Sequence, residues 1–236
     1  MYSDVFCRVY NEFGWNYYPE SFGQQLLCWL KENQIAPRNA LDMACGTGIL
    51  CRILHDAGIS SRGMDLSAGM IDIAAGENPD IPFDVADMVT YAPGQTFDLV
   101  TCTGDALNHI PDLTAIAQIM ENTYNLLNSG GYFVFDLLDE REVSTSEPFE
   151  MDFSPTTRVW FQMTRPQFNR VNLEIRVWEN GEEAFRETIR ETIHDVETVC
   201  ALVKKAGFRL IKCSHRLPDT SGTEATTWFI IAKKEN

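Results

Sequence analysis

The sequence predicts an α/β fold built on a Rossmann-like, doubly wound parallel sheet. Three observations lead to this fold class. Short apolar segments alternate with helical segments between residues 40 and 138, as is typical of βαβ units. The first apolar segment leads into a small-residue turn, Cys45-Gly46-Thr47-Gly48, and then into a helix. Acidic residues, Asp65 and Asp87, stand at the ends of the next two strands.

Hydrophobic periodicity and helix-ending residues define the elements of this first half. Residues 97–103 are apolar enough for a strand that is covered by helices on both faces. Residues 112–127 carry their apolar side chains on one stripe, and Asn128-Ser129-Gly130-Gly131 ends that helix. Strands are expected at 40–44, 61–65, 83–88, 97–103 and 132–138, and helices at 48–57, 67–75 and 112–127.

The alternation changes after Leu138. Three apolar segments separated by Pro166-Gln167 and Asn180-Gly181 predict an antiparallel insertion, because Asn-Gly is a strong hairpin signal. A helix capped by Asp195 and two more strands then complete the chain. The expected strands are 156–165, 170–178, 184–193, 208–215 and 226–233, and the expected helix is 196–206.

The chain is expected to have three parts. Residues 1–36 form an N-terminal helical and aromatic lid, residues 37–140 and 195–236 form the core, and residues 141–194 form the insertion over the ligand edge. The crowded aromatic side chains before Pro19 fit two hypotheses. They either pack in the ordinary way or form a mobile flap over a ligand.

Charge and cysteine content narrow the class of protein. The chain has 34 acidic and 19 basic residues and a net charge of −15, which disfavours nucleic acid and an anionic membrane surface as partners. Its seven cysteines include no C-x-x-C pair, so neither a disulfide framework nor a metal site is expected. No leader or membrane-spanning pattern is recognised. The prediction is a cytoplasmic protein, either a monomer or a homodimer.

Acidic side chains at the strand ends point to an adenosine ligand. Because parallel strands present their carboxyl ends at one edge, Asp65 and Asp87 are expected beside the glycine turn. An acid after the second strand can accept both hydroxyl hydrogens of a ribose, and an acid after the third can accept from an exocyclic amine. Met88 would pack on the purine face. No G-K-[ST] motif marks a phosphate site.

Five motifs in order resemble those of class I S-adenosylmethionine-dependent methyltransferases. Residues 41–48, Leu-Asp-Met-Ala-Cys-Gly-Thr-Gly, look like motif I, and residues 63–70 are similar to the second motif. Ala86-Asp87-Met88 resembles the third, residues 97–102 the fourth, and residues 127–132 the stretch before the fifth strand. The resemblance implies a seven-stranded sheet with an antiparallel last strand. The insertion also resembles that of small-molecule methyltransferases related to glycine and amino-sugar N-methyltransferases.

The resemblance further implies which residues bind S-adenosylmethionine. The glycine turn would hold the methionine end, with Asp42 organising that turn, and Asp65 would bind the ribose. Leu66 and Met70 would flank the adenine, while Thr103 would lie beneath the sulfonium. The expected cofactor-binding residues are Asp42, Cys45, Gly46, Gly48, Asp65, Leu66, Met70, Asp87, Met88 and Thr103.

Methyl transfer from a sulfonium is an in-line displacement, so that catalysis depends mainly on placing the nucleophile and excluding water. An amine acceptor must be neutral and a hydroxyl must lose its proton, so a nearby base helps. His109 is the candidate base, although it fits the packing of its loop equally well. Tyr10, followed by Asn11, replaces the family's Tyr-Asp motif and is the second catalytic candidate. Tyr17, Tyr18 and His109 are the expected acceptor-binding residues.

Three functions are compatible with these patterns. The first is methyl transfer from S-adenosylmethionine to an amine or hydroxyl of a small molecule. The second is a non-catalytic protein that binds S-adenosylmethionine or S-adenosylhomocysteine as a sensor or partner subunit. The third, a nicotinamide-dependent dehydrogenase, is opposed by Cys51, which stands where the dinucleotide fingerprint has its third glycine.

Overall fold

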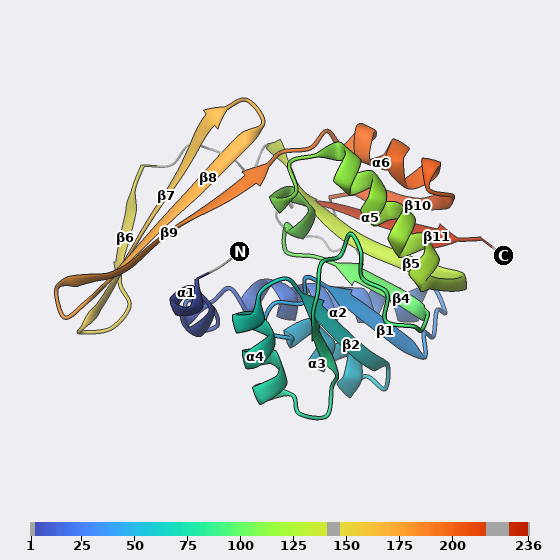
Figure 1. Cartoon of the computed structure of the whole chain (residues 1–236), viewed down its shortest axis with the longest axis horizontal. Helices are drawn as coiled ribbons and strands as arrows, with labels where there is room; N and C mark the ends of the chain where they lie inside the picture. The colour runs from blue at the N-terminus through green and yellow to red at the C-terminus, as the bar shows by residue number, and fades with distance from the viewer. Residues whose placement is uncertain (1–2, 141–146, 216–226, 236) are drawn as a thin grey trace.

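Two β-sheets organise the chain, as the computed structural model shows for residues 3–140, 147–215 and 227–235 (Figure 1). The larger sheet has seven strands in the order β10-β11-β5-β4-β1-β2-β3. β11 pairs antiparallel with both of its neighbours, whereas the other pairs are parallel. The predicted seven-stranded sheet with an antiparallel last strand is therefore confirmed. Its strands are β1 (Asn39–Met43), β2 (Ser60–Asp65), β3 (Phe83–Val85), β4 (Phe97–Cys102), β5 (Leu127–Leu138), β10 (Phe208–Ser214) and β11 (Thr227–Lys234).

Helices cover both faces of this sheet (Figure 1). On one face, Leu26 of a covering helix belongs to the same buried cluster as Val134 of β5. Ile119, of a helix on the second face, belongs to another cluster with Phe133. Since neighbouring residues of a strand point to opposite faces, a single strand such as β5 contributes to both cores. The first face carries α2 (Tyr17–Glu32), α3 (Ile49–Asp56) and α4 (Ala68–Glu77), and the second carries α5 (Leu113–Leu126) and α6 (Val196–Lys205).

The helices begin at the residues that the sequence indicates. The Ser67 side chain accepts from the Met70 N–H at 3.4 Å and caps α4. The Asp195 carboxylate accepts from the Thr198 N–H at 2.8 Å and caps α6. These side chains satisfy backbone donors that have no partner inside the first helical turn.

The start of the fifth strand differs from the expected one. β5 begins at Leu127 and follows α5 without a break, so residues 128–131 belong to the strand as well as ending the helix. The pairing register with β4 shifts between Phe97 and Leu99. Gly130 has φ +79°, and a Cβ at Gly131 would lie 2.9 Å from the Asn128 carbonyl oxygen. The two glycines therefore allow a tight irregularity inside one strand.

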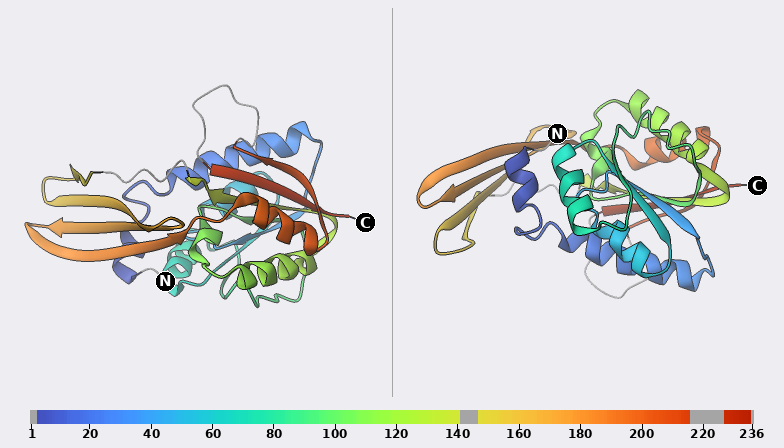
Figure 2. Two further views of the ribbon diagram at one scale, coloured as in Figure 1. Left: turned by 90° about the horizontal axis from the view of Figure 1, so that it is seen from above. Right: turned by 60° about the horizontal axis from the view of Figure 1, so that its bottom comes forward.

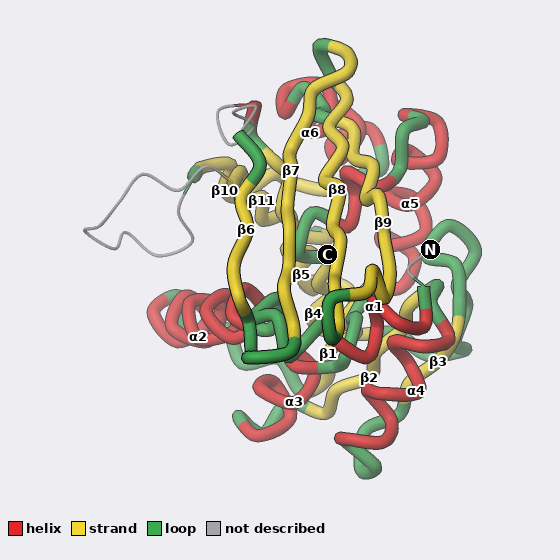
Figure 3. Tube along the Cα trace, turned by 90° about the vertical axis from the view of Figure 1, so that its left-hand side faces the viewer, coloured by secondary structure: helices red, strands yellow, loops and turns green. Residues whose placement is uncertain are grey.

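The insertion forms a separate antiparallel sheet of β6 (Phe149–Asp152), β7 (Thr157–Gln167), β8 (Arg170–Glu179) and β9 (Glu182–Thr192). Three of these strands were expected from the sequence, but β6 was not. Pro166-Gln167 lies at the end of β7 rather than in the turn. Asn180 and Gly181 have φ +54° and +86° and form the predicted hairpin turn. Figure 3 shows this sheet standing across the carboxyl-terminal edge of the seven-stranded sheet.

The N-terminal segment packs between the two parts. Figure 2 shows α1 (Asp4–Val9) between the second sheet and α4. Phe6 of α1 is fully buried in a cluster with Met70 of α4 and Val159 of β7. The Trp15 ring stacks on Tyr10, with ring centroids 5.7 Å apart, and meets Phe161 of β7 edge-on at 5.9 Å. Aromatic packing therefore joins the N-terminal segment to the insertion.

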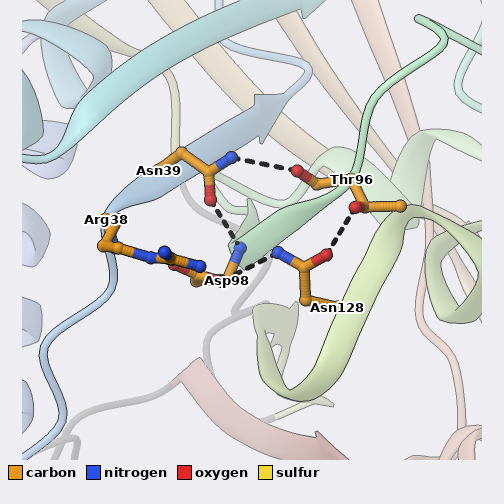
Figure 4. A network of polar contacts seen from close by, with 5 residues as sticks. All are labelled: Arg38, Asn39, Thr96, Asp98 and Asn128. Atoms are coloured by element: carbon orange, nitrogen blue, oxygen red, sulfur yellow. Dashed lines mark hydrogen bonds and ion pairs between the residues drawn. The ribbon is translucent and has the colours of Figure 1, made fainter.

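A polar network fixes the amino-terminal edge of the sheet (Figure 4). The Asp98 carboxylate, at the start of β4, accepts from the Arg38 N–H at 2.9 Å and from the Asn128 side-chain amide at 2.8 Å. Asn39 accepts from the Asp98 N–H at 2.9 Å and donates to the Thr96 carbonyl at 2.9 Å. These bonds tie together the starts of β1, β4 and β5 at the edge opposite the candidate site.

Candidate functional site

A cavity of about 270 Å³ lies at the carboxyl-terminal edge of the seven-stranded sheet. This edge is where doubly wound sheets bind ligands. Residues from the ends of β1, β2 and β4, from the loop after β3 and from the N-terminal segment meet there. The predicted site residues that line it are Tyr10, Tyr18, Asp42, Cys45, Gly46, Asp65, Leu66, Met70, Asp87, Met88, Thr103 and His109.

Asp65 is fixed against the glycine turn. One carboxylate oxygen accepts from the Gly46 N–H at 3.0 Å, and the other accepts from the Ser67 N–H at 2.8 Å. Burial raises the pKa of Asp65, while these backbone bonds act in the opposite direction. Each oxygen of a carboxylate has two lone pairs. Both oxygens of Asp65 can therefore accept one further hydrogen bond from a ligand in the cavity.

Gly48 does not line the cavity, in contrast to the expectation. It has φ +81°, and a Cβ there would lie 2.8 Å from the Cζ of Phe83. Gly48 is thus required for the turn before α3 and for close packing on β3. The G-x-G pattern alone does not distinguish a glycine that faces a ligand from one that faces the core.

Asp42 borders the cavity from β1 while its side chain is buried. The Thr101 hydroxyl, on the neighbouring strand β4, donates to it at 2.7 Å. Burial raises the pKa of Asp42 to about 7, and the nearby Asp65 adds to this increase, whereas the bond from Thr101 opposes it. Asp42 is therefore a carboxyl group that changes charge near neutral pH.

Asp87 and Met88 lie in the loop after β3, since β3 ends at Val85 rather than at residue 88 as expected. One Asp87 oxygen accepts from the Val89 N–H at 2.8 Å. The Asn122 side chain, on α5, donates to the Met88 carbonyl at 2.9 Å. These bonds hold the loop against the cavity.

Two tyrosines and a histidine also line the cavity. Burial raises the pKa of Tyr10 to about 12, with Asp105 and Asp65 adding to the shift. Burial also lowers the pKa of His109, against the effect of a backbone hydrogen bond with Arg190 of β9. Both groups are therefore held in their neutral forms at neutral pH.

Tyr17 is not part of the cavity. It is the first residue of α2, and its side chain is 74% exposed. The next residue, Tyr18, faces inward, and its hydroxyl donates to Asp136. One step along a helix turns a side chain by about 100°, so adjacent tyrosines cannot share a face.

Asn11, which replaces the acid of the family's Tyr-Asp motif, keeps an acceptor at this position. Its side-chain oxygen accepts from the Thr47 hydroxyl of the glycine turn at 2.9 Å. The N-terminal segment is thereby bound directly to the turn beside the cavity.

The sequence interpretation missed two buried polar residues near the cavity, Asn108 and Asp136. Asn108 accepts from the Leu138 N–H at 3.0 Å and donates to the Thr192 carbonyl at 2.8 Å. It thereby joins the segment before His109 to the ends of β5 and β9. The available signal for Asp136 was a single acid within the apolar run of residues 132–138.

Residues 15–212 match the family model described as "Methyltransferase domain". The chain is a member of the S-adenosylmethionine-dependent methyltransferase family. The cofactor is thus S-adenosylmethionine. The cavity fits it: the fixed carboxylate of Asp65 and the apolar side chain of Met88 suit a nucleoside, and the open space at Gly46 lets a ligand approach the backbone.

Other members of the family resemble this methyltransferase over most or part of its length. It is 26% identical over 219 residues to the putative methyltransferase YqeM of Bacillus subtilis, covering 87% of this chain and 88% of that protein. It is 31% identical over 119 residues to dTDP-3-amino-3,6-dideoxy-alpha-D-glucopyranose N,N-dimethyltransferase of Streptomyces fradiae, covering 50% and 46%. The solved structure of CalS10, an amino pentose methyltransferase of Micromonospora echinaspora, has a TM-score of 0.76 at 18% identity and covers 99% and 98%.

The described part of this methyltransferase shows neither a metal-binding cluster nor a membrane-spanning helix. Residues 3–140, 147–215 and 227–235 contain no group of three His, Cys, Asp or Glu side chains arranged to hold a metal ion. Across the same ranges, no helix is long and apolar enough to span a membrane.

Proposed function

We propose that this methyltransferase transfers the methyl group of S-adenosylmethionine to an amine of a small molecule, with a hydroxyl as the second acceptor type. The observation that carries the proposal is the cavity itself. Its lining combines Asp65, which suits an adenosine, with the side chains of Tyr10, Tyr18 and His109. Two relatives whose names describe amino-sugar methylation support a small amine as acceptor.

On the cofactor side, Asp65 would accept from the ribose hydroxyls while it keeps its bonds from Gly46 and Ser67. Asp87 and Met88 would receive the adenine. When bound, S-adenosylmethionine supplies an electrophilic methyl group on a positively charged sulfur. The side chains of Asp65 and Asp87 lie on the walls of this cavity, where negative charge favours a cationic ligand.

On the acceptor side, the protein contributes mainly orientation. Tyr10 and Tyr18 present one phenol ring each to the cavity. A bound amine held between them would approach the methyl group along a fixed line, which converts a bimolecular encounter into an intramolecular one. The packed N-terminal segment and the second sheet would act as the lid that excludes water from this step.

His109 is the proposed base. Because burial lowers its pKa, the imidazole is neutral at neutral pH and can take the proton that an amine loses. The acceptor preference for amines also fits the charge of the walls. Among the described residues, the lining contains the acids Asp65 and Asp87 and neither Lys nor Arg, so a positively charged ammonium product is stabilised there.

A non-catalytic protein that binds the cofactor as a sensor or partner is the alternative. Product formation decides between the two. The enzyme should be incubated with S-adenosylmethionine and with dTDP-3-amino-3,6-dideoxyglucose or other amino sugars, beside the matching hydroxyl sugars, and methylated products should be sought by mass spectrometry. Methylation of an amine supports the proposal. S-adenosylhomocysteine binding without any methylated product across amines and hydroxyls would favour the sensor.

A further inference from the structure

Asp136 is a buried acid that the proposed cofactor and acceptor contacts do not use. It lies in β5 and is 0% exposed. It alternates with Val134, which packs in the cluster beneath α2, and therefore points toward that helix. A fully buried carboxylate is costly unless several donors satisfy it. The groups that donate hydrogen bonds to Asp136 indicate its role.

Three donors from two distant segments converge on this carboxylate. The Tyr18 hydroxyl of α2 donates to one oxygen, Oδ2. The Gly104 N–H donates to the same oxygen at 2.9 Å, and the Asp105 N–H donates to the other at 3.0 Å. Hydrogen bonds to an ionised acceptor are the strong ones among such bonds. Asp136 therefore couples α2 to the turn that follows β4.

Both of these segments line the cavity where the acceptor is proposed to bind. Tyr18, Thr103 and Gly104 are in its lining. Asp105 has φ +60°, a left-handed conformation that is costly for a residue with a side chain. A Cβ at Gly104 would lie 3.9 Å from the Tyr18 ring, so the turn and the ring lie close together. The two bonded amides hold the turn in this shape.

We propose that Asp136 is the positioning residue of the acceptor side. It fixes the Tyr18 ring and the 103–105 turn, so that the acceptor nitrogen is held in line with the methyl group. The inference rests on the proposed methyl transfer. Asp136 itself reaches neither substrate nor cofactor and acts through Tyr18 and the turn.

Two variants separate this role from general stability. Asp136→Asn keeps the volume but replaces one acceptor oxygen with an NH₂ donor, which would face an N–H or O–H donor. Tyr18→Phe removes only the hydroxyl and keeps both amide bonds. Asp98→Asn is the matched control, because Asp98 also accepts from one backbone N–H and from side-chain donors, at the opposite edge (Figure 4).

The kinetic test compares turnover with cofactor binding. With an amine that the wild type methylates, Asp136→Asn should lower kcat roughly 10- to 100-fold and leave the Kd for S-adenosylhomocysteine within about threefold. Tyr18→Phe should lower kcat by a smaller factor, and Asp98→Asn should leave it unchanged. Wild-type kcat in Asp136→Asn, or an equal loss of S-adenosylhomocysteine affinity, would overturn the proposal.

A second readout does not depend on the acceptor. In ¹⁵N-labelled protein, Asp136→Asn should shift the amide resonances of Gly104 and Asp105. Tyr18→Phe should shift that of Gly104, because Tyr18 and Gly104 share one oxygen. Unchanged Gly104 resonances in both variants would refute the positioning role even in an active enzyme. A wild type without turnover would instead refute the proposed function. Should Asp136→Asn not fold, Tyr18→Phe carries both measurements.

Discussion

Replacing Asp42 with Asn should remove a pH dependence from the stability of the protein. Burial raises the pKa of Asp42 to about 7 in the folded chain, against an ordinary value of 3.8. Between these values the folded state holds a proton that the unfolded state has lost. The contribution of this group to stability is therefore full below the ordinary pKa and is lost as pH rises toward 7.

The size of the effect follows from the shift. One pKa unit corresponds to about 1.4 kcal/mol, so between about pH 5 and pH 7 the wild type should lose about 2–3 kcal/mol through Asp42 alone. Urea unfolding of the wild type and Asp42→Asn at several pH values measures the difference between them. The variant should gain that amount relative to the wild type over this range.

Asp98→Asn is the control for this experiment. Although burial acts to raise the pKa of Asp98, hydrogen bonds from the Arg38 N–H and the Asn128 amide lower it. Its contribution to stability is thus lost only as pH falls through that lowered value. The difference between the wild type and Asp98→Asn should stay constant above pH 5. A difference for Asp42→Asn that is equally constant would refute the reasoning about its burial.

Three further predictions test the site and its support. In steady-state assays, His109→Gln should lower kcat about 100-fold. Wild-type turnover should fall only below about pH 6.5, since burial lowers the pKa of His109. Unchanged turnover in the variant would mean that His109 only packs its loop. Gly63→Ala should destabilise the fold by about 1–3 kcal/mol in urea unfolding, because the new Cβ would lie 2.5 Å from Phe83; a neutral result would mean that Phe83 moves freely. Thr47→Val should cost about 0.5–1.5 kcal/mol through the lost bond to Asn11, and calorimetry showing no loss would contradict a structural role for that contact.

The core was predictable because its local signals agree with its tertiary structure. Ser67 and Asp195 begin helices both by sequence preference and by the bonds that they accept. The acids Asp65 and Asp87 reach one cavity because parallel strands deliver their carboxyl ends to the same edge. Local chemistry and sheet topology point to the same site in this half of the chain.

The acceptor side was less predictable because it is built from long-range contacts. Tyr17 and Tyr18 are adjacent residues of the same type, so the sequence does not distinguish them. Only the placement of α2 on the sheet decides which one faces the cavity. Asp136 becomes meaningful only when Tyr18 and Gly104, far away in sequence, are brought to it. β6 is short and its side chains are exposed, so its sequence carries no buried-strand pattern.

Isothermal titration with S-adenosylhomocysteine, beside NAD in the same buffer, tests the central claim most directly. The protein should first be freed of bound cofactor and shown to be folded. We expect binding of S-adenosylhomocysteine alone, and binding at least about tenfold weaker in Asp65→Ala, because this variant lacks the carboxylate that faces the cavity. Binding of neither ligand, or equal binding by Asp65→Ala, would contradict the assignment of this cavity as the cofactor site.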